Sequence, residues 1–150
     1  MILQEWHINL NNNRVLIVYK ELKSCFEFEK YLENVTSRKL RIAFAKMRTC
    51  SHSLNIHTGR YTRLDRSLRL CQLCDIAEVE DEFHFIFKCT CYDQLRDRYI
   101  KRYYRNRPNM CKLIELFNTQ NQSEVYLLCK YITEALKVRN SLIGMSDFWL

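Results

Sequence analysis

The chain has 150 residues, with 24 lysines and arginines against 17 aspartates and glutamates, which gives a formal net charge of +7. Hydrophobic residues make up 47% and charged residues 27%, a composition that excludes a disordered chain and fits one globular domain with a buried core. Two glycines and one proline are too few for a hairpin-rich β fold, so the composition favours helices.

The N-terminal quarter predicts weakly defined structure. Residues 1–13 end in three consecutive asparagines and are expected to be a flexible arm. Residues 14–23 fit either a strand or the first turn of a helix. Ser24 and Glu27 have the spacing of a capping box, which predicts a helix that begins there.

The following segments have helical periodicity. A helix is predicted over residues 35–49, where four apolar residues recur at the spacing of a buried stripe: Leu40, Ala43, Phe44 and Met47. Further helices are predicted at roughly 92–105, 110–118 and 123–139.

We find no linker that would divide the chain. The sequence therefore predicts a mainly α fold, in which residues 14–143 form a single helical domain and residues 144–150 a C-terminal tail.

Residues 71–91, CQLCDIAEVEDEFHFIFKCTC, hold four of the eight cysteines and one of the four histidines. The spacing Cys71-x2-Cys74-x9-His84-x4-Cys89 is typical of a closed structural zinc site. The first two thiols would form a small knuckle, and a short helix over residues 80–88 would carry His84. Three thiolates and one imidazole predict one structural Zn²⁺ with no open position for a substrate.

The last ligand of this motif is ambiguous. Cys91 lies two residues after Cys89 and could replace it through a small backbone shift. Without the cysteines, His84 would be interpreted as a core histidine. The other four cysteines lie on apolar helical patterns and are expected to be buried small hydrophobic residues: Cys25, Cys50, Cys111 and Cys129.

Basic residues are concentrated in one part of the chain. No acidic residue lies between Glu33 and Asp65, and this interval carries seven cations: Arg38, Lys39, Arg41, Lys46, Arg48, Arg60 and Arg63. On a helix, several of them would form a row beside the apolar stripe. Such a surface predicts phosphate contacts with RNA or single-stranded DNA that do not depend on base sequence, the alternative being a solvated helix face.

The segment LCQLCDIAEVEDEFHFIFKC resembles the zinc-binding domain near the C-terminus of reverse transcriptases from non-LTR retrotransposons. The resemblance continues upstream through FEFEKYL, KLRIAFAKMRTCSHSLNIHTGRY and RSLRLC, and downstream through YDQLRDRYI and KYITEALKVRNSLI. It implies the zinc ligands Cys71, Cys74, His84 and Cys89. Many members have proline after the last ligand, where this chain has Thr90.

The resemblance implies an accessory module with no catalytic centre of its own. Polymerase activity would require a pair of carboxylates of the Tyr-x-Asp-Asp type, and the chain contains no Asp-Asp. It would then be the detached tail of a polyprotein, with nucleic acid and other parts of the reverse transcriptase as partners. The alternative is a structural or protein-docking zinc module derived from a mobile element.

Two further expectations concern enzymes and location. The sequence has neither an HExxH helix nor a glycine-rich phosphate loop, so it is not expected to be an enzyme. It has no apolar run of membrane-spanning or signal-peptide length. With eight cysteines, this predicts an intracellular location, nucleus or cytoplasm, where thiols stay reduced and no membrane is a partner.

Overall fold

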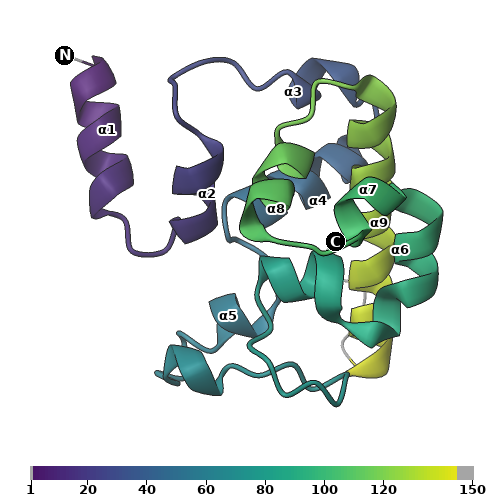
Figure 1. Ribbon diagram of the computed structural model, residues 1–150. Helices are drawn as coiled ribbons and strands as arrows, with labels where there is room; N and C mark the ends of the chain where they lie inside the picture. Colours follow the sequence, from purple (N-terminus) through teal and green to yellow (C-terminus); the bar gives the residue numbers. More distant parts are fainter. Residues whose placement is uncertain (1, 145–150) are drawn as a thin grey trace.

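The computed structural model describes residues 2–144, and this part of the chain is mainly α-helical, as predicted, with no β-strand (Figure 1). Its α-helices, in chain order, are α1 (Ile2–Asn12), α2 (Ile17–Leu22), α3 (Tyr31–Asn34), α4 (Arg38–Arg48), α5 (Asn55–Thr58), α6 (Asp93–Tyr99), α7 (Arg102–Arg105), α8 (Met110–Phe117) and α9 (Gln122–Leu142). Between α5 and α6 lie two 3-10 turns, Arg66–Leu68 and Thr90–Tyr92, and one π-helical turn, His84–Lys88.

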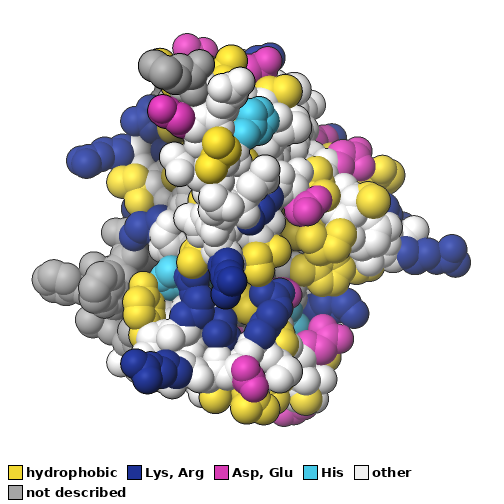
Figure 2. All heavy atoms as spheres, turned by 90° about the vertical axis from the view of Figure 1, so that its left-hand side faces the viewer, with side chains coloured by type: hydrophobic (Ala, Val, Ile, Leu, Met, Phe, Trp, Pro, Cys, Tyr) yellow, Lys and Arg dark blue, Asp and Glu magenta, His cyan; other side chains and the backbone are white. Residues whose placement is uncertain are grey.

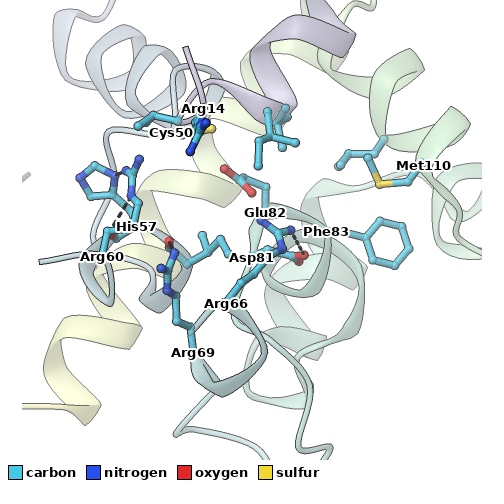
Figure 3. A pocket seen from close by; sticks show the side chains of 15 residues that line it. Arg14, Cys50, His57, Arg60, Arg66, Arg69, Asp81, Glu82, Phe83 and Met110 are labelled. Atoms are coloured by element: carbon cyan, nitrogen blue, oxygen red, sulfur yellow. Dashed lines mark hydrogen bonds and ion pairs between the residues drawn. The ribbon is translucent and has the colours of Figure 1, made fainter. Parts of the chain in front are cut away.

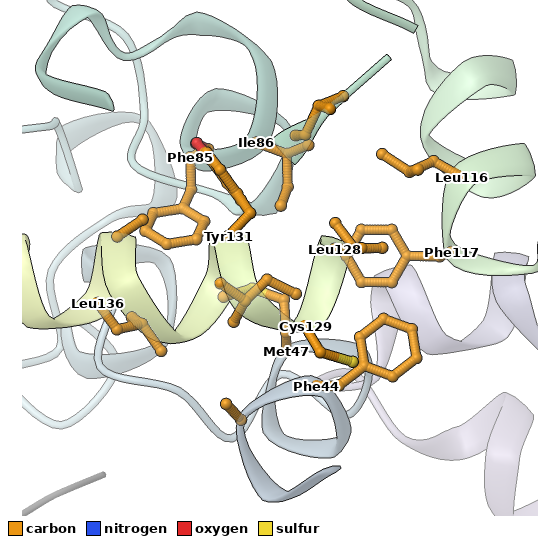
Figure 4. Close-up of a cluster of buried hydrophobic side chains, with 14 of the residues drawn as sticks. Phe44, Met47, Phe85, Ile86, Leu116, Phe117, Leu128, Cys129, Tyr131 and Leu136 are labelled. Carbon is orange, nitrogen blue, oxygen red and sulfur yellow. The ribbon is translucent and has the colours of Figure 1, made fainter. Parts of the chain in front are cut away.

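The long helix α9 is the centre of the fold, and α4 and α6 pack along it. Figure 4 shows the core where side chains from α4, α8 and α9 meet. Phe44 stacks on Phe117 of α8 with ring centroids 5.5 Å apart, and Met47 of α4 is fully buried. Burying a side chain of this size stabilises a fold by about 1.5–3 kcal/mol, so this layer accounts for much of its stability.

The periodicity of α4 and α9 follows from this packing. All four residues of the predicted stripe on α4 are buried, so the prediction for residues 35–49 is confirmed with slightly shorter bounds. The helix predicted over 123–139 corresponds to α9, whose N-cap is Asn121, with its side chain accepting a hydrogen bond from the backbone N–H of Glu124 at 3.1 Å.

The N-terminal segment differs from its prediction. Residues predicted as an arm form the helix α1, which stands apart from the helical core in Figure 1 and buries only Leu10. The ambiguous residues 14–23 contain the helix α2. The capping box at Ser24 was wrong, because Lys23 donates to the Glu27 carbonyl and pairs with Glu29 at 3.1 Å, which holds the segment in a non-helical path.

The predicted helix at 92–105 is divided in two. Ile100 has an extended backbone and is 3% exposed, so α6 ends at Tyr99 and α7 begins at Arg102. The free energy gained by burying the Ile100 side chain outweighs the free energy that continuation of the helix would contribute. Of the predicted tail, only Gly144 lies within the described residues. Within residues 2–144, no helix has the length and apolar character that crossing a membrane requires.

Candidate metal centre and basic surface

The knuckle that carries Cys71 and Cys74 is a loop closed by backbone hydrogen bonds. Leu70 and Val79 form an isolated antiparallel bridge. The backbone N–H of Cys71 donates to the Glu78 carbonyl at 2.9 Å. Ala77 adopts φ 56°, which turns the chain back on itself. The loop therefore returns both thiols towards the segment that carries His84.

His84 opens the π-helical turn His84–Lys88, shorter than the helix predicted over residues 80–88. Asp81 caps this turn by accepting a hydrogen bond from the backbone N–H of His84 at 2.9 Å. The Cys89 N–H donates to the His84 carbonyl at 2.9 Å, which places both residues on one side of the turn. Phe85 and Ile86 point into the core instead and are fully buried.

The four predicted ligands lie together. The ligand atoms of Cys71, Cys74, His84 and Cys89 are all within 4.8 Å of one another. The Cys71 and Cys89 sulfurs are 3.9 Å apart, and the Cys74 sulfur lies 3.3 Å from His84 Nε2. A tetrahedral zinc site with normal bond lengths has ~3.8 Å between sulfurs and ~3.5 Å from sulfur to nitrogen. These two distances match a tetrahedral site, and the 4.8 Å limit for the whole set means that small side-chain movements would allow the cluster to hold a metal ion.

The surroundings of the cluster also suit a metal. Cys71, His84 and Cys89 are buried and Cys74 is half-buried. His84 Nδ1 lies 3.5 Å from the Glu78 carboxylate, the place where a carboxylate commonly orients a metal-bound imidazole. Nδ1 is buried and, among the described residues, has no hydrogen-bond partner of good geometry, so a slight movement of the half-exposed Glu78 would satisfy it.

Without a metal the cluster shares its protons unevenly. A hydrogen bond from Cys89 lowers the pKa of Cys71 to about 3, and the same bond raises the pKa of Cys89. Burial alone would lower the pKa of His84, but the Cys71 thiolate outweighs it and raises that pKa. The environment therefore favours a thiolate at Cys71 and a protonated imidazole at His84. A metal ion would bind the thiolate and displace the proton from the imidazole.

The structure distinguishes Cys89 from Cys91. The Cys91 side chain is exposed, and its sulfur donates to the Leu73 carbonyl at 2.8 Å, outside the cluster. Among the other thiols, Cys50 and Cys129 are buried as expected, whereas Cys25 and Cys111 are exposed. The expectation of buried thiols was therefore wrong for those two.

The predicted row of cations on α4 is not continuous. Arg38 and Lys39 are exposed, Lys46 is half-buried, and Arg41 donates to the Leu32 carbonyl at 3.1 Å. Arg48 does not belong to the surface. It is 3% exposed, donates to the Phe117 carbonyl at 2.7 Å and pairs with Glu29 at 3.3 Å.

The remaining predicted cations follow α5. Arg63 is exposed and has φ 55°. Arg60 lines a pocket of about 140 Å³, together with three arginines that the sequence analysis missed: Arg14, Arg66 and Arg69. Arg66 and Arg69 follow Asp65, the residue that ends the acid-free interval, so counting only that interval excluded them.

No protein-family model, curated protein or solved structure significantly matches this chain. Its function must therefore be inferred from the cluster and from the distribution of charge.

Proposed function

We propose that this chain is a zinc-stabilised, non-catalytic module that binds nucleic acid, of the kind found near the C-terminus of non-LTR retrotransposon reverse transcriptases. The observation that carries the proposal is the cluster of Cys71, Cys74, His84 and Cys89, whose ligand atoms lie within 4.8 Å of one another. The reverse-transcriptase resemblance rests on the sequence motifs, and the cluster geometry is compatible with it.

Zinc is the metal that this donor set suits best. Thiolates and imidazole are the usual ligands of zinc, and hard oxygen-preferring cations such as Mg²⁺ and Ca²⁺ do not select them. With four protein ligands, no coordination position would be left for a substrate. The ion would connect the knuckle to the π-helical turn and act as part of the fold.

A catalytic role finds no support elsewhere in the described residues. The nearest arrangement to a nucleophile pair is Cys50, beside Glu82 and His52. Burial raises the pKa of Cys50 to about 12, so this thiol stays protonated at neutral pH. A protonated thiol is a poor nucleophile.

Charge supports a nucleic-acid partner. The chain carries a net charge of +7, and Figure 2 shows lysine and arginine side chains gathered in the lower half of the face that carries α1, α2 and α5. A concentrated basic surface attracts phosphates with little dependence on base sequence. We expect affinity for RNA and single-stranded DNA in about the micromolar range or weaker, decreasing steeply with salt.

A protein-docking role is the second candidate. The observation that favours it is the set of exposed apolar side chains in the N-terminal segment, including Phe26 at 53% and Phe28 at 64% exposure. Apolar side chains gathered at a surface often mark contacts with other proteins. Ionic strength distinguishes the two candidate functions, because nucleic-acid binding weakens as salt rises, whereas docking of apolar side chains depends far less on it.

Metal analysis tests the proposal first. Native mass spectrometry of protein purified under reducing conditions should show one zinc per chain. Cys74→Ser should release it, whereas Cys91→Ser should retain it because the Cys91 sulfur bonds to the Leu73 carbonyl. A metal-free chain that is fully folded would contradict the zinc assignment. If the zinc-loaded protein showed no salt-dependent binding of nucleic acid, the nucleic-acid role would be contradicted and the docking role would remain.

A further inference from the structure

One pocket collects arginines from distant parts of the sequence. It lies among α2, α5 and the segment that leads into the metal cluster, and Figure 3 shows the labelled arginines around it. Arg14 precedes α2, Arg60 follows α5, and Arg66 and Arg69 come from the chain before Cys71. Its volume of about 140 Å³ is well above the ~15 Å³ that a single water needs, so a larger ligand can enter.

Two of the arginines are free to meet a ligand. Arg14 is exposed and makes no hydrogen bond or ion pair within residues 2–144. The Arg66 side chain is 53% exposed, and its contact with Asp81 is long, at 3.8 Å. A surface pair of this length contributes little, so Arg66 can exchange it for a stronger anion.

The other two arginines are held in position by the backbone. Arg69 donates from Nε to the Leu64 carbonyl and from Nη1 to the Ile56 carbonyl, both at 2.9 Å, and Nη2 makes no hydrogen bond to any of residues 2–144. Arg60 donates to the His57 carbonyl at 3.2 Å. Fixed guanidinium groups lose little conformational entropy when they bind an anion.

Gly59 makes the position of Arg69 possible. A Cβ added at Gly59 would lie 2.7 Å from Arg69 Cγ and 2.8 Å from the Asn55 carbonyl oxygen. No side chain fits in this space. The glycine therefore allows the arginine stem to cross α5 closely and reach the pocket.

The acidic residues of the pocket only partly offset these cations. Glu82 is buried, and its carboxylate accepts a hydrogen bond from His52 Nε2 at 2.9 Å, which partly offsets its charge. Asp81 already accepts the His84 N–H. The pKa of His57 is lowered, chiefly by burial and then by Arg60, so this ring is neutral at pH 7. Four cations against two carboxylates leave an excess positive charge.

We propose that this pocket binds the terminal phosphate of a single-stranded nucleic acid. The inference rests on the proposed function. It assigns nucleic-acid binding to a site away from the predicted row of cations on α4. Arginines converge on one hollow, and apolar residues, among them Val18, Ile56 and Leu113, form part of its lining. A terminal phosphate carries a charge of about −1.5 to −2 and can enter such a hollow, whereas an internal phosphodiester carries only one charge on a continuous chain.

Fluorescence anisotropy with three labelled oligonucleotides of one sequence tests the assignment: one with a 5′-phosphate, one with a 3′-phosphate and one with neither. We expect the zinc-loaded protein to bind one phosphorylated form about tenfold more tightly than the unphosphorylated one. Arg14→Gln combined with Arg66→Gln should remove this preference. Both side chains are exposed, so the fold should tolerate the changes, and circular dichroism would verify it.

The matched control is Arg98→Gln combined with Lys137→Gln, which removes two exposed charges outside the pocket lining and should retain the preference. Salt-dependent binding of all three oligonucleotides with equal affinity would overturn the pocket assignment and leave the proposed function intact. A preference for a phosphorylated oligonucleotide that survived in the Arg14→Gln, Arg66→Gln variant would also overturn the pocket assignment. No binding of any oligonucleotide would overturn both. If inorganic phosphate alone then raised the melting temperature through the pocket arginines, the pocket would serve small phosphorylated molecules instead.

Discussion

Three arginines, Arg48, Arg96 and Arg139, are buried in the core of this protein, at 3–6% exposure. Each bonds to carbonyl or carboxylate groups of other segments, which for Arg48 and Arg139 are distant in the sequence. Arg96, for example, donates to the carbonyls of Ile86 and Cys89 at 2.8 Å and so fixes the turn beside the metal cluster. Burying a guanidinium is costly unless its donors find acceptors, and within residues 2–144 only Nη1 of Arg139 is buried among these donors without one. These arginines therefore connect segments and cannot be exchanged for other polar residues.

Arg48 provides the first test at this scale. Arg48→Gln should destabilise the protein by about 3 kcal/mol, because the shorter side chain cannot satisfy both the Phe117 carbonyl and Glu29. Arg38→Gln, an exposed change on the same helix, should alter stability by less than about 0.5 kcal/mol. Urea unfolding followed by circular dichroism would compare the two. Equal effects would show that Arg48 is solvated.

Arg139 and Glu80 form the second buried pair. Arg139 contacts both carboxylate oxygens of Glu80, at 2.6 and 2.8 Å, and Glu80 also accepts the Asn55 N–H at 2.7 Å. Arg139→Leu should cost about 3–5 kcal/mol, because it leaves a buried carboxylate unpaired. Removing both charges, with Glu80→Gln added, should recover part of this loss. A double-mutant cycle from unfolding free energies measures the coupling, and strictly additive effects would contradict it.

Sequence spacing was sufficient to predict the cluster, because its four residues lie within nineteen positions and have the spacing that is typical of zinc ligands. It was insufficient for the buried arginines. The partners of Arg48 and Arg139 lie 69 and 59 residues away, so only the folded arrangement of helices brings them together. Helical spacing placed Arg48 beside the apolar stripe, but it could not show that the guanidinium of Arg48 is buried while Arg38 is exposed. Of the pocket arginines, Arg60 was among the predicted cations, whereas Arg14, Arg66 and Arg69 lie outside the acid-free interval and only the fold brings them beside it.

Among the elements, α4 and α9 could be predicted because their apolar residues repeat at helical spacing against a common core. The break at Ile100 could not, since it depends on a tertiary site that buries one side chain. The junction of α7 and α9 depends on such contacts too. Glu124, in the first turn of α9, accepts hydrogen bonds from Lys101, from Thr119 at 2.8 Å and from Tyr104 at 3.1 Å.

This junction predicts a pH dependence. Burial tends to raise the pKa of Glu124, but the bonds from Lys101, Thr119 and Tyr104 outweigh it and hold the pKa below its usual 4.5. A carboxyl whose pKa is lowered by folding stabilises the protein above its unfolded pKa, and this stabilisation is lost as pH falls through the folded value. Glu124→Gln should therefore reduce stability at pH 7, with a difference from the parent that shrinks as the pH falls from about 5 to 3.

Urea unfolding at a series of pH values would measure this difference directly. Glu115→Gln is the control, because Glu115 is an exposed carboxylate on the neighbouring helix α8. It should change stability little at any pH in the series. A difference for Glu124→Gln that stays constant down to pH 3 would contradict a role for its charge.

In the whole molecule, the two halves of the metal cluster are attached to the helical core unequally. The turn that carries His84 and Cys89 is part of the core: Phe85 and Ile86 are fully buried, and the Tyr131 hydroxyl of α9 donates to the Phe85 carbonyl at 2.6 Å. The knuckle is anchored less firmly: Cys71 is buried in the core, but Leu73, Cys74 and Val79 are only partly buried against it. A single bridge, Leu70–Val79, and a few backbone hydrogen bonds close it.

This asymmetry predicts how the protein would respond to loss of the proposed metal. From the structure we expect the loss of order after chelation to be concentrated in the knuckle. Backbone amides of residues 71–79 should exchange with deuterium about tenfold faster or more, because the proposed metal would connect both thiols of the knuckle to the turn at His84. Residues 84–92 should change less, since core packing and Arg96 hold them, and α4 and α9 should remain protected.

Hydrogen–deuterium exchange of the zinc-loaded protein, before and after chelation under reducing conditions, would measure these differences segment by segment. Cys74→Ser should reproduce the pattern without a chelator, which separates metal loss from any effect of the chelator itself. Uniform deprotection of residues 71–92 would mean that the metal, and not the core, positions the turn at His84. Deprotection that extended into α4 and α9 would show that the helical core itself folds only with its metal bound.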